Sequence, residues 1–267
     1  STMEVRKMGS IRLLTMDEKP ANSLTPEILH ELAGLLRDLE KDREARTVVL
    51  CSRIPTLFSS GLALRELTSK TRTRASLSLF WMVHQVYRIV KGIRSSRLIY
   101  IASLHGAVIG SAVSLAAACD FRFASESTWF WLPDPLYGGL LADGGLTCIR
   151  EWVGVQGAYR FCMTNARISL REAQSLGFVS PCPEADILPM ALEFAKNLGH
   201  CAESTLYETK RLLRKRRGLS FPWRQLIRIT ASEDWRDRLQ EIQTKGNKGH
   251  EASRENHCHN RRHRWYR

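Results

Sequence analysis

What the sequence lacks narrows the classes of protein to which it can belong. No stretch approaches the roughly 20 consecutive apolar residues that cross a bilayer, so no membrane-spanning helix is predicted. No segment repeats at a fixed period, which excludes a solenoid architecture. With 267 residues, 43% of them hydrophobic, the chain is long enough to bury one sizeable core with a smaller additional segment.

The cysteines include no Cys-x-x-Cys pair, and their number is odd. Disulfide frameworks and most zinc sites use paired cysteines at short, regular spacing. We therefore predict a reducing compartment, in which most of these side chains serve as small apolar residues of the core. The seven are Cys51, Cys119, Cys148, Cys162, Cys182, Cys201 and Cys258.

Acidic residues are scarce relative to basic ones. The chain has 27 Asp and Glu against 40 Lys and Arg, a formal net charge of +13. Much of the excess lies in residues 210–217 and in the tail after Lys245. Such a charge indicates an anionic partner, and the candidates are a phosphorylated ligand, nucleic acid or an acidic lipid surface. For the tail, the simpler interpretation is a solvated chain end.

Short apolar strands alternate with amphipathic helices along the first two hundred residues, a pattern typical of an α/β fold with a largely parallel sheet. Beyond Gly144 the pattern becomes helical, and from Thr244 onward the polar sequence predicts disorder. Strands are predicted at residues 11–16, 47–52, 98–103, 121–123 and 178–180, and helices at 25–40, 75–94, 170–176, 186–198, 202–217 and 222–240.

Two glycine-containing loops, each leading toward an apolar helix, are the most informative local feature. The first is Phe58-Ser59-Ser60-Gly61-Leu62, and the second runs from Gly106 through Gly110-Ser111 into an alanine-rich stretch. A helix start presents unpaired N–H groups and a positive dipole end, and glycine lets a ligand approach the main chain closely. Two such loops directed at one point would form an oxyanion hole.

Four motifs, in this order and spacing, resemble those of the crotonase superfamily, the enoyl-CoA hydratases and isomerases. The resemblance extends from about Ile11 to Leu239 and is closest to the mitochondrial Δ3,Δ2-enoyl-CoA isomerases. The motifs are Pro20-Ala21-Asn22-Ser23-Leu24, the Gly-Leu-x-Leu of residues 58–67, His105-Gly106 through Asp120-Phe121-Arg122, and Ile168-Ser169-Leu170 through Gly177-Phe178-Val179.

The resemblance implies a fold and an assembly. It implies an α/β fold, a crotonase-type spiral of ββα units, with the acyl-CoA site in residues 1–200. A helical segment at 201–243 would pack subunits into a homotrimer or a dimer of trimers, and residues 244–267 would form the disordered basic tail. It also implies an acyl-CoA thioester substrate with no separate cofactor, and a location in the mitochondrial matrix or a peroxisome-type organelle.

The resemblance further assigns residues to a site. The N–H groups of Leu62 and Ser111 would hold the thioester oxygen, with serine at residue 111 where the family has glycine. We expect Arg65 and residues 210–217 to contact the phosphates of coenzyme A, because Arg and Lys bind phosphate through charge-assisted hydrogen bonds. The residues expected to bind substrate or coenzyme A are Ala21, Asn22, Ser60, Gly61, Leu64, Arg65, Gly110 and Leu136.

The catalytic carboxylates discriminate between reactions. Hydratases of the family carry one glutamate where this chain has Ser114 and a second where it has Asp134. Adding water to a double bond calls for two carboxylates, whereas moving a double bond calls for one base that takes and returns a proton. With one carboxylate kept, an isomerase is favoured over a hydratase. Pro135 predicts an extended backbone at Asp134.

Several alternatives remain open. Asp143 lies within one residue of an aspartate of the dienoyl-CoA isomerases, but it also suits the N-cap of the following helix. A catalytically weak protein that binds RNA through basic segments, including Arg261, Arg262 and Arg264, is a different class of function. A metal site in the tail is a further alternative, although its spacing matches no standard zinc pattern. Its candidate ligands are His257, Cys258, His259 and His263.

Overall fold

The computed structural model describes residues 2–183 and 187–214, together with Ile227 and Gln240. Apart from those two positions, the helix predicted at 222–240 and the predicted tail at 244–267 lie outside the described residues. The candidate metal ligands of the tail also lie outside them.

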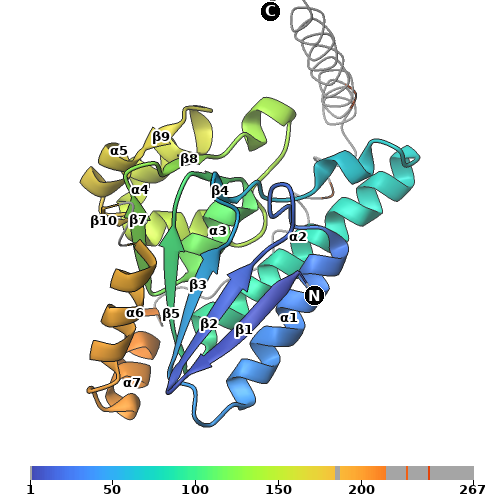
Figure 1. The fold of residues 1–267 in the computed structure, drawn as a ribbon. Coiled ribbons are helices and arrows are strands. Elements are labelled where there is room, and N and C mark those ends of the chain that lie inside the picture. The colour runs from blue at the N-terminus through green and yellow to red at the C-terminus, as the bar shows by residue number, and fades with distance from the viewer. Residues whose placement is uncertain (1, 184–186, 215–226, 228–239, 241–267) are drawn as a thin grey trace, which may run out of the picture.

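A six-stranded sheet forms the centre of the fold, in the order β1-β2-β3-β5-β7-β10 (Figure 1). Its first two strands are antiparallel, and every later pair is parallel, which confirms the largely parallel sheet. β2 and β3 have the predicted bounds, because each is a short, mainly apolar run. The strands are β1 (Met3–Met8), β2 (Ile11–Met16), β3 (Thr47–Ser52), β5 (Ile99–Leu104), β7 (Phe121–Ser125) and β10 (Ser180–Cys182).

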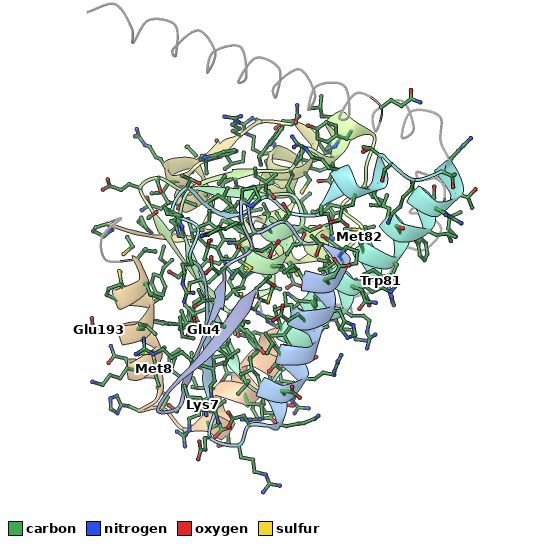
Figure 2. All side chains as sticks on the ribbon, turned by 45° about the vertical axis from the view of Figure 1, so that its right-hand side comes forward. Glu4, Lys7, Met8, Trp81, Met82 and Glu193 are labelled. Carbon is green, nitrogen blue, oxygen red and sulfur yellow. The ribbon has the colours of Figure 1, made fainter. Side chains whose placement is uncertain are left out.

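The outermost strand, β1, was not predicted from the sequence. Figure 2 shows Glu4, Lys7 and Met8 on this strand, and most of its residues are at least partly exposed. An edge strand pairs on one side only and tolerates charged side chains, so it lacks the apolar run by which a buried strand is recognised.

A second sheet, in the order β4-β6-β8-β9, lies beside the first and was also not predicted. Each of its strands has only two or three residues, too few to display an alternating pattern. Three of these strands lead directly into the loops of the candidate site. They are β4 (Leu57–Ser59), β6 (Ala107–Ile109) and β8 (Trp129–Trp131), and the sheet ends with β9 (Ile168–Ser169).

Helices cover both faces of the six-stranded sheet (Figure 1). α1 (Pro26–Lys41) and α2 (Arg72–Ser95) belong to the main apolar cluster on one face, and α6 (Ile187–Leu198) forms a smaller cluster on the other. Neighbouring positions of one strand divide between the two clusters, since Leu14 packs in the larger and Leu13 in the smaller. This is the alternation of side chains that a strand imposes.

α2 is amphipathic and slightly longer than predicted. Met82 is fully buried, whereas its neighbour Trp81 is 39% exposed (Figure 2). The first turn consists of the polar residues Arg72, Thr73 and Arg74. These residues show no apolar periodicity, and for this reason the sequence predicted that the helix begins only at Ala75.

The N-cap of α1 offers a test of a local interaction. The Thr25 side chain accepts a hydrogen bond from the Ile28 N–H at 3.3 Å, whereas Thr71, the N-cap residue of α2, makes no side-chain capping bond. We expect Thr25→Ala to lower the free energy of unfolding by about 1 kcal/mol. Thr71→Ala is the matched control and should change it by less than about 0.5 kcal/mol. Urea unfolding of both variants measures the difference, and equal losses would contradict the capping role.

The helices after Gly144 follow the predicted order. α4 (Gly145–Met163) bends at Gly154, which has a φ of 70°. α5 (Leu170–Ser175) begins at the predicted residue, and the Ser169 side chain caps it by accepting a hydrogen bond from the Glu172 N–H. The following strand β10 begins two residues later than predicted, because Phe178 and Val179 pack in the main core instead of pairing.

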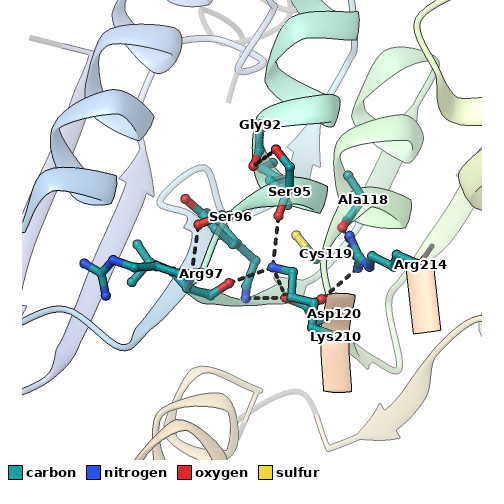
Figure 3. Close-up of polar contacts among 12 residues, drawn as sticks. Gly92, Ser95, Ser96, Arg97, Ala118, Cys119, Asp120, Lys210 and Arg214 are labelled. Atoms are coloured by element: carbon teal, nitrogen blue, oxygen red, sulfur yellow. Dashed lines mark hydrogen bonds and ion pairs between the residues drawn. The ribbon is translucent and has the colours of Figure 1, made fainter. Parts of the chain in front are cut away.

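α7 (Glu203–Arg214) is joined to the core through the carboxylate of Asp120, whose side chain is 11% exposed (Figure 3). The Lys210 Nζ lies 2.9 Å and the Arg214 guanidinium 2.8 Å from its two oxygens. Lys210 also donates to the carbonyl oxygens of Ile93 and Leu98, at 3.0 and 2.6 Å.

The prediction that residues 210–217 bind phosphate is therefore wrong for Lys210 and Arg214. Four residues apart on a helix, they share a face, and that face points into the protein. Both side chains form ion pairs with Asp120, so neither positive charge faces a ligand. Residues 215–217 lie outside the described part of the chain.

Two predictions from composition agree with the described residues. All six cysteines in this part are free thiols, and four of them are buried. None of the helices described here is both long and apolar enough to cross a bilayer.

Candidate active site

The first glycine loop follows β4 and is held against residues 21–24. The Ser60 N–H donates to the Ala21 carbonyl at 3.0 Å, and the Leu24 N–H donates to the Gly61 carbonyl at 2.8 Å. Gly61 has a φ of 77°, a conformation that glycine adopts without steric cost. These bonds fix the direction of the peptide that leads into Leu62.

The second loop connects β6 to the buried helix α3 (Ser111–Ala118). Gly110 has φ 56° and ψ −128°, and its N–H donates to the Trp131 carbonyl at 2.8 Å. Ser111 is the first residue of α3, so its N–H has no partner within the helix. The loop therefore presents the positive end of α3 to the space above it.

The two loops meet as the sequence predicted. A Cβ added to Gly61 would lie 2.5 Å from the Ile109 carbonyl oxygen and 3.2 Å from the Ser111 nitrogen. Among the main-chain bonds that link elements of the described residues, none uses the N–H of Leu62 or of Ser111. Neither N–H is therefore used by a main-chain acceptor of another element in this part of the chain.

A cavity of about 80 Å³ lies at this meeting point. Its walls are mainly apolar, and its polar side chains are two serines, a tyrosine and two aspartates. No lysine, arginine or histidine is among them. The lining residues are Ser60, Leu62, Leu64, Leu79, Val83, Ile109, Gly110, Ser111, Pro133, Asp134, Tyr137, Gly139, Leu140, Leu141, Ala142 and Asp143.

Asp134 begins a short 3₁₀ helix (Asp134–Tyr137) that follows β8. The extended backbone predicted from Pro135 is wrong, because the turn is closed by N–H groups of Gly138 and Gly139 that donate to the Asp134 carbonyl. Asp134 is partly exposed as a residue, but desolvation of its carboxyl group, together with the charge of Asp143, raises the pKa of Asp134 to about 7. Asp134 can therefore exist in either protonation state near neutral pH.

Asp143 supplies a second carboxylate to the same cavity. Its Oδ1 accepts from the Ser114 hydroxyl at 2.8 Å and from the Gly145 N–H at 2.9 Å. The prediction that Asp143 is the N-cap residue of the following helix is wrong by one position, because α4 begins at Gly145 and Gly144 is its N-cap residue. Asp143 nevertheless accepts from the first N–H of that helix. Position 114 itself carries no carboxylate, as the sequence shows, but Asp143 comes from the loop before α4 into hydrogen-bonding distance of the Ser114 side chain.

The other residues predicted to bind substrate fall into two groups. Ser60, Leu64 and Gly110 line the cavity, whereas Arg65 is exposed on the 3₁₀ helix Leu64–Leu67 and Leu136 is 38% exposed outside the lining.

The loop residues Ala21 and Asn22 contribute to the position of the first glycine loop. The Asn22 amide donates to the Ser52 hydroxyl at 2.7 Å and to the Phe58 carbonyl at 3.0 Å, so its side chain is used within the protein. Ala21 accepts from Ser60 as described above. Neither residue lines the cavity, and a contact with coenzyme A stays a prediction for both.

Several lining residues were not assigned to the site from the sequence, among them Leu79, Val83 and Tyr137. Leu79 and Val83 are four residues apart on α2, and both line the cavity. Their spacing alone does not separate a cavity wall from a core face. No sequence pattern indicated that Tyr137 lines the cavity, because its position there depends on the 3₁₀ turn. His105, the first residue of the third family motif, is bonded through Nε2 to the Ile54 carbonyl at 2.7 Å and does not line the cavity.

No group of three or more histidine, cysteine, aspartate or glutamate side chains within the described ranges could hold a metal ion.

Comparison with known proteins identifies the class. A family model described as enoyl-CoA hydratase/isomerase matches residues 6–220. A Bacillus subtilis (strain 168) protein named probable enoyl-CoA hydratase is 30% identical over 206 residues, 76% of this chain and 78% of that protein.

Solved structures share the fold. The human mitochondrial delta3-delta2-enoyl-CoA isomerase matches with a TM-score of 0.82 at 20% identity, over 93% of this chain and 99% of that one. An enoyl-CoA hydratase from Bacillus halodurans matches with a TM-score of 0.79 at 18% identity, over 90% of this chain and 100% of that one.

The two sheets, the covering helices and the converging glycine loops define a crotonase-type α/β fold. The chain belongs to the enoyl-CoA hydratase/isomerase family, as its motifs predicted.

Proposed function

We propose that this protein is an enoyl-CoA isomerase that converts a 3-enoyl-CoA to the 2-trans-enoyl-CoA in the β-oxidation of unsaturated fatty acids. The observation that carries the proposal is the position of Asp134 in one cavity with the N–H donors of Leu62 and Ser111. Coenzyme A enters as part of the substrate, and the reaction needs no further cofactor.

The proposed reaction is a proton transfer from C2 to C4. The thioester oxygen accepts hydrogen bonds from Leu62 N–H and Ser111 N–H. The Asp134 carboxylate removes a proton from C2, the two donors stabilise the dienolate, and the same carboxyl group returns the proton to C4. A pKa of Asp134 near 7 suits both steps, because the group must first accept and then release a proton.

The oxyanion donors contribute more in this cavity than they would in water. Each is main-chain and already oriented, so no reorganisation accompanies the development of charge. The dipole of α3 acts in the same direction as the Ser111 N–H. The serine at position 111 keeps this donor, because the interacting atom belongs to the backbone.

A panel of thioesters tests the proposal. Purified protein is given 3-enoyl-, 2-enoyl- and dienoyl-CoA substrates, and the reactions are followed by ultraviolet absorbance and product chromatography. Conversion of the 3-enoyl thioester alone is expected. Formation of a 3-hydroxyacyl-CoA from the 2-enoyl thioester would identify a hydratase instead. Inactivity on all three would contradict an enoyl-CoA enzyme.

The pH dependence of the reaction follows from the raised pKa of Asp134. Only the carboxylate form accepts the C2 proton, so kcat/KM is expected to fall as the pH drops through about 7. An aspartate with an ordinary pKa would place this decline near pH 4. Rates measured with a 3-enoyl-CoA from about pH 5 to 9 distinguish a raised pKa from an ordinary one. A constant rate down to about pH 5 would contradict the assignment of Asp134 as the base.

Hydration is the second candidate function, and Asp143 favours it. Its buried Oδ2 has no hydrogen-bond partner among the described residues, and the residue lines the cavity with Asp134. Two carboxylates could share the water that adds to a double bond. The 2-enoyl arm of the panel separates this reaction from isomerisation.

A further inference from the structure

Asp143 is almost completely buried next to the start of α4. The residue is 1% exposed, and only its Oδ1 makes the bonds to Ser114 and Gly145. Its Oδ2 is buried without a hydrogen-bond partner in the described part of the chain. A buried charged oxygen without a partner costs free energy. The bonds to Ser114 and Gly145 account for Oδ1 and leave the burial of Oδ2 unexplained.

The contact between Asp143 and α3 depends on a glycine. A Cβ added to Gly145 would lie 2.0 Å from the Ser114 Oγ and 2.8 Å from its Cβ. The start of α4 therefore lies directly against α3, with no room for any side chain. This close approach brings the Gly145 N–H and the Ser114 hydroxyl to the same oxygen of Asp143.

The two aspartates differ in the donors that surround them. Burial raises the pKa of Asp143, but the hydroxyls of Ser111 and Ser114 and the Gly145 N–H oppose the rise. Asp134 has no side-chain donor among the influences on its pKa, and the charge of Asp143 raises that pKa further. The Ser114 hydroxyl and the Gly145 N–H both donate to Asp143, and such donors favour its charged form, so the negative charge of the pair is stabilised on Asp143 and the shared proton on Asp134.

The other titratable groups near the pair do not change this order. Burial raises the pKa of Cys148 to about 11 and that of Cys162 to about 12, so both thiols are neutral near pH 7. Arg94, whose guanidinium lies 3.6 Å from the Cys148 sulfur, is paired with Glu151 at 2.6 Å. Tyr137 is the remaining titratable residue of the lining.

We propose that Asp143 is the charged partner of Asp134, held as a carboxylate by Ser114 and Gly145, and that its charge makes Asp134 a stronger base, which accepts the C2 proton and holds it until it returns to C4. Asp143 is a positioning residue that acts through Asp134. This role rests on the proposed function and specifies how the same acid both takes and releases a proton.

The substitution Asp143→Asn tests the pairing. The oxygen of the new amide can still accept from Ser114 and Gly145, so the loop keeps its bonds while the charge is lost. Removal of the negative charge should lower the pKa of Asp134. The acid decline of kcat/KM for a 3-enoyl-CoA should then move to lower pH by about one unit. Asp38→Asn, which neutralises an exposed carboxylate on α1, is the control and should leave the decline in place.

A second measurement does not depend on activity. The carboxyl carbon of Asp134 is titrated by NMR in carbon-13-labelled protein, with its signal identified by its loss in Asp134→Asn. In Asp143→Asn the Asp134 midpoint should fall by about one unit. An unchanged midpoint would overturn the pairing, even if the variant were less active or less stable. A shifted midpoint in a protein inactive on every thioester would keep the pairing and remove the proposed function.

Discussion

Asp134→Asn is expected to lower kcat/KM for a 3-enoyl-CoA by about 10²–10⁴-fold, the range typical of a lost general acid–base group. Asparagine has nearly the same shape but cannot accept the C2 proton. Because the carboxyl group acts on the reacting proton, the loss should appear in kcat more than in KM. The measurement is the rate of 2-enoyl-CoA formation at about pH 8, where most of the wild-type Asp134 is ionised.

Asp38→Asn is again the matched control, because it removes a carboxylate exposed on α1. It should keep the wild-type rate. Circular dichroism and thermal unfolding of both variants verify that the fold is retained. A folded Asp134→Asn protein with the wild-type rate would remove Asp134 from the mechanism and, with it, the isomerase proposed here.

Gly61→Ala is expected to lower the same rate by about 10²–10³-fold, the effect of losing one oxyanion donor. The added Cβ would lie 2.5 Å from the Ile109 carbonyl oxygen and 3.2 Å from the Ser111 nitrogen. The two loops would have to separate, so the N–H groups of Leu62 and Ser111 could no longer contact one oxygen. Rates with a 3-enoyl-CoA and the affinity for a saturated acyl-CoA are the measurements.

Gly9→Ala separates this effect from simple backbone strain. Gly9 has a φ of 60°, similar to the 77° of Gly61, but a Cβ there would meet no atom within 4 Å. It should lose about 1–2 kcal/mol of stability through its left-handed backbone and keep its activity. An active Gly61→Ala enzyme with only the stability loss of Gly9→Ala would contradict the oxyanion role of this loop.

Local signals predicted much of the fold. The apolar runs of β2 and β3 and the caps at Thr25 and Ser169 lie where their residues indicate. Such features depend on neighbours within a few positions of the chain, so a single sequence contains them. The four strands of the second sheet depend on distant partners, and no pattern of two or three residues announces them.

The sequence by itself determined the family, the two glycine loops and the presence of an acid at position 134, because these depend on residue type and spacing. The tertiary structure decided that Lys210 and Arg214 face Asp120 and that Asp143 reaches Ser114, 29 residues away. Both outcomes follow from the way helices pack: α7 lies against the end of α3, and the start of α4 lies against its middle. Which side chains meet across such contacts depends on the position of whole elements, which no local stretch of sequence encodes.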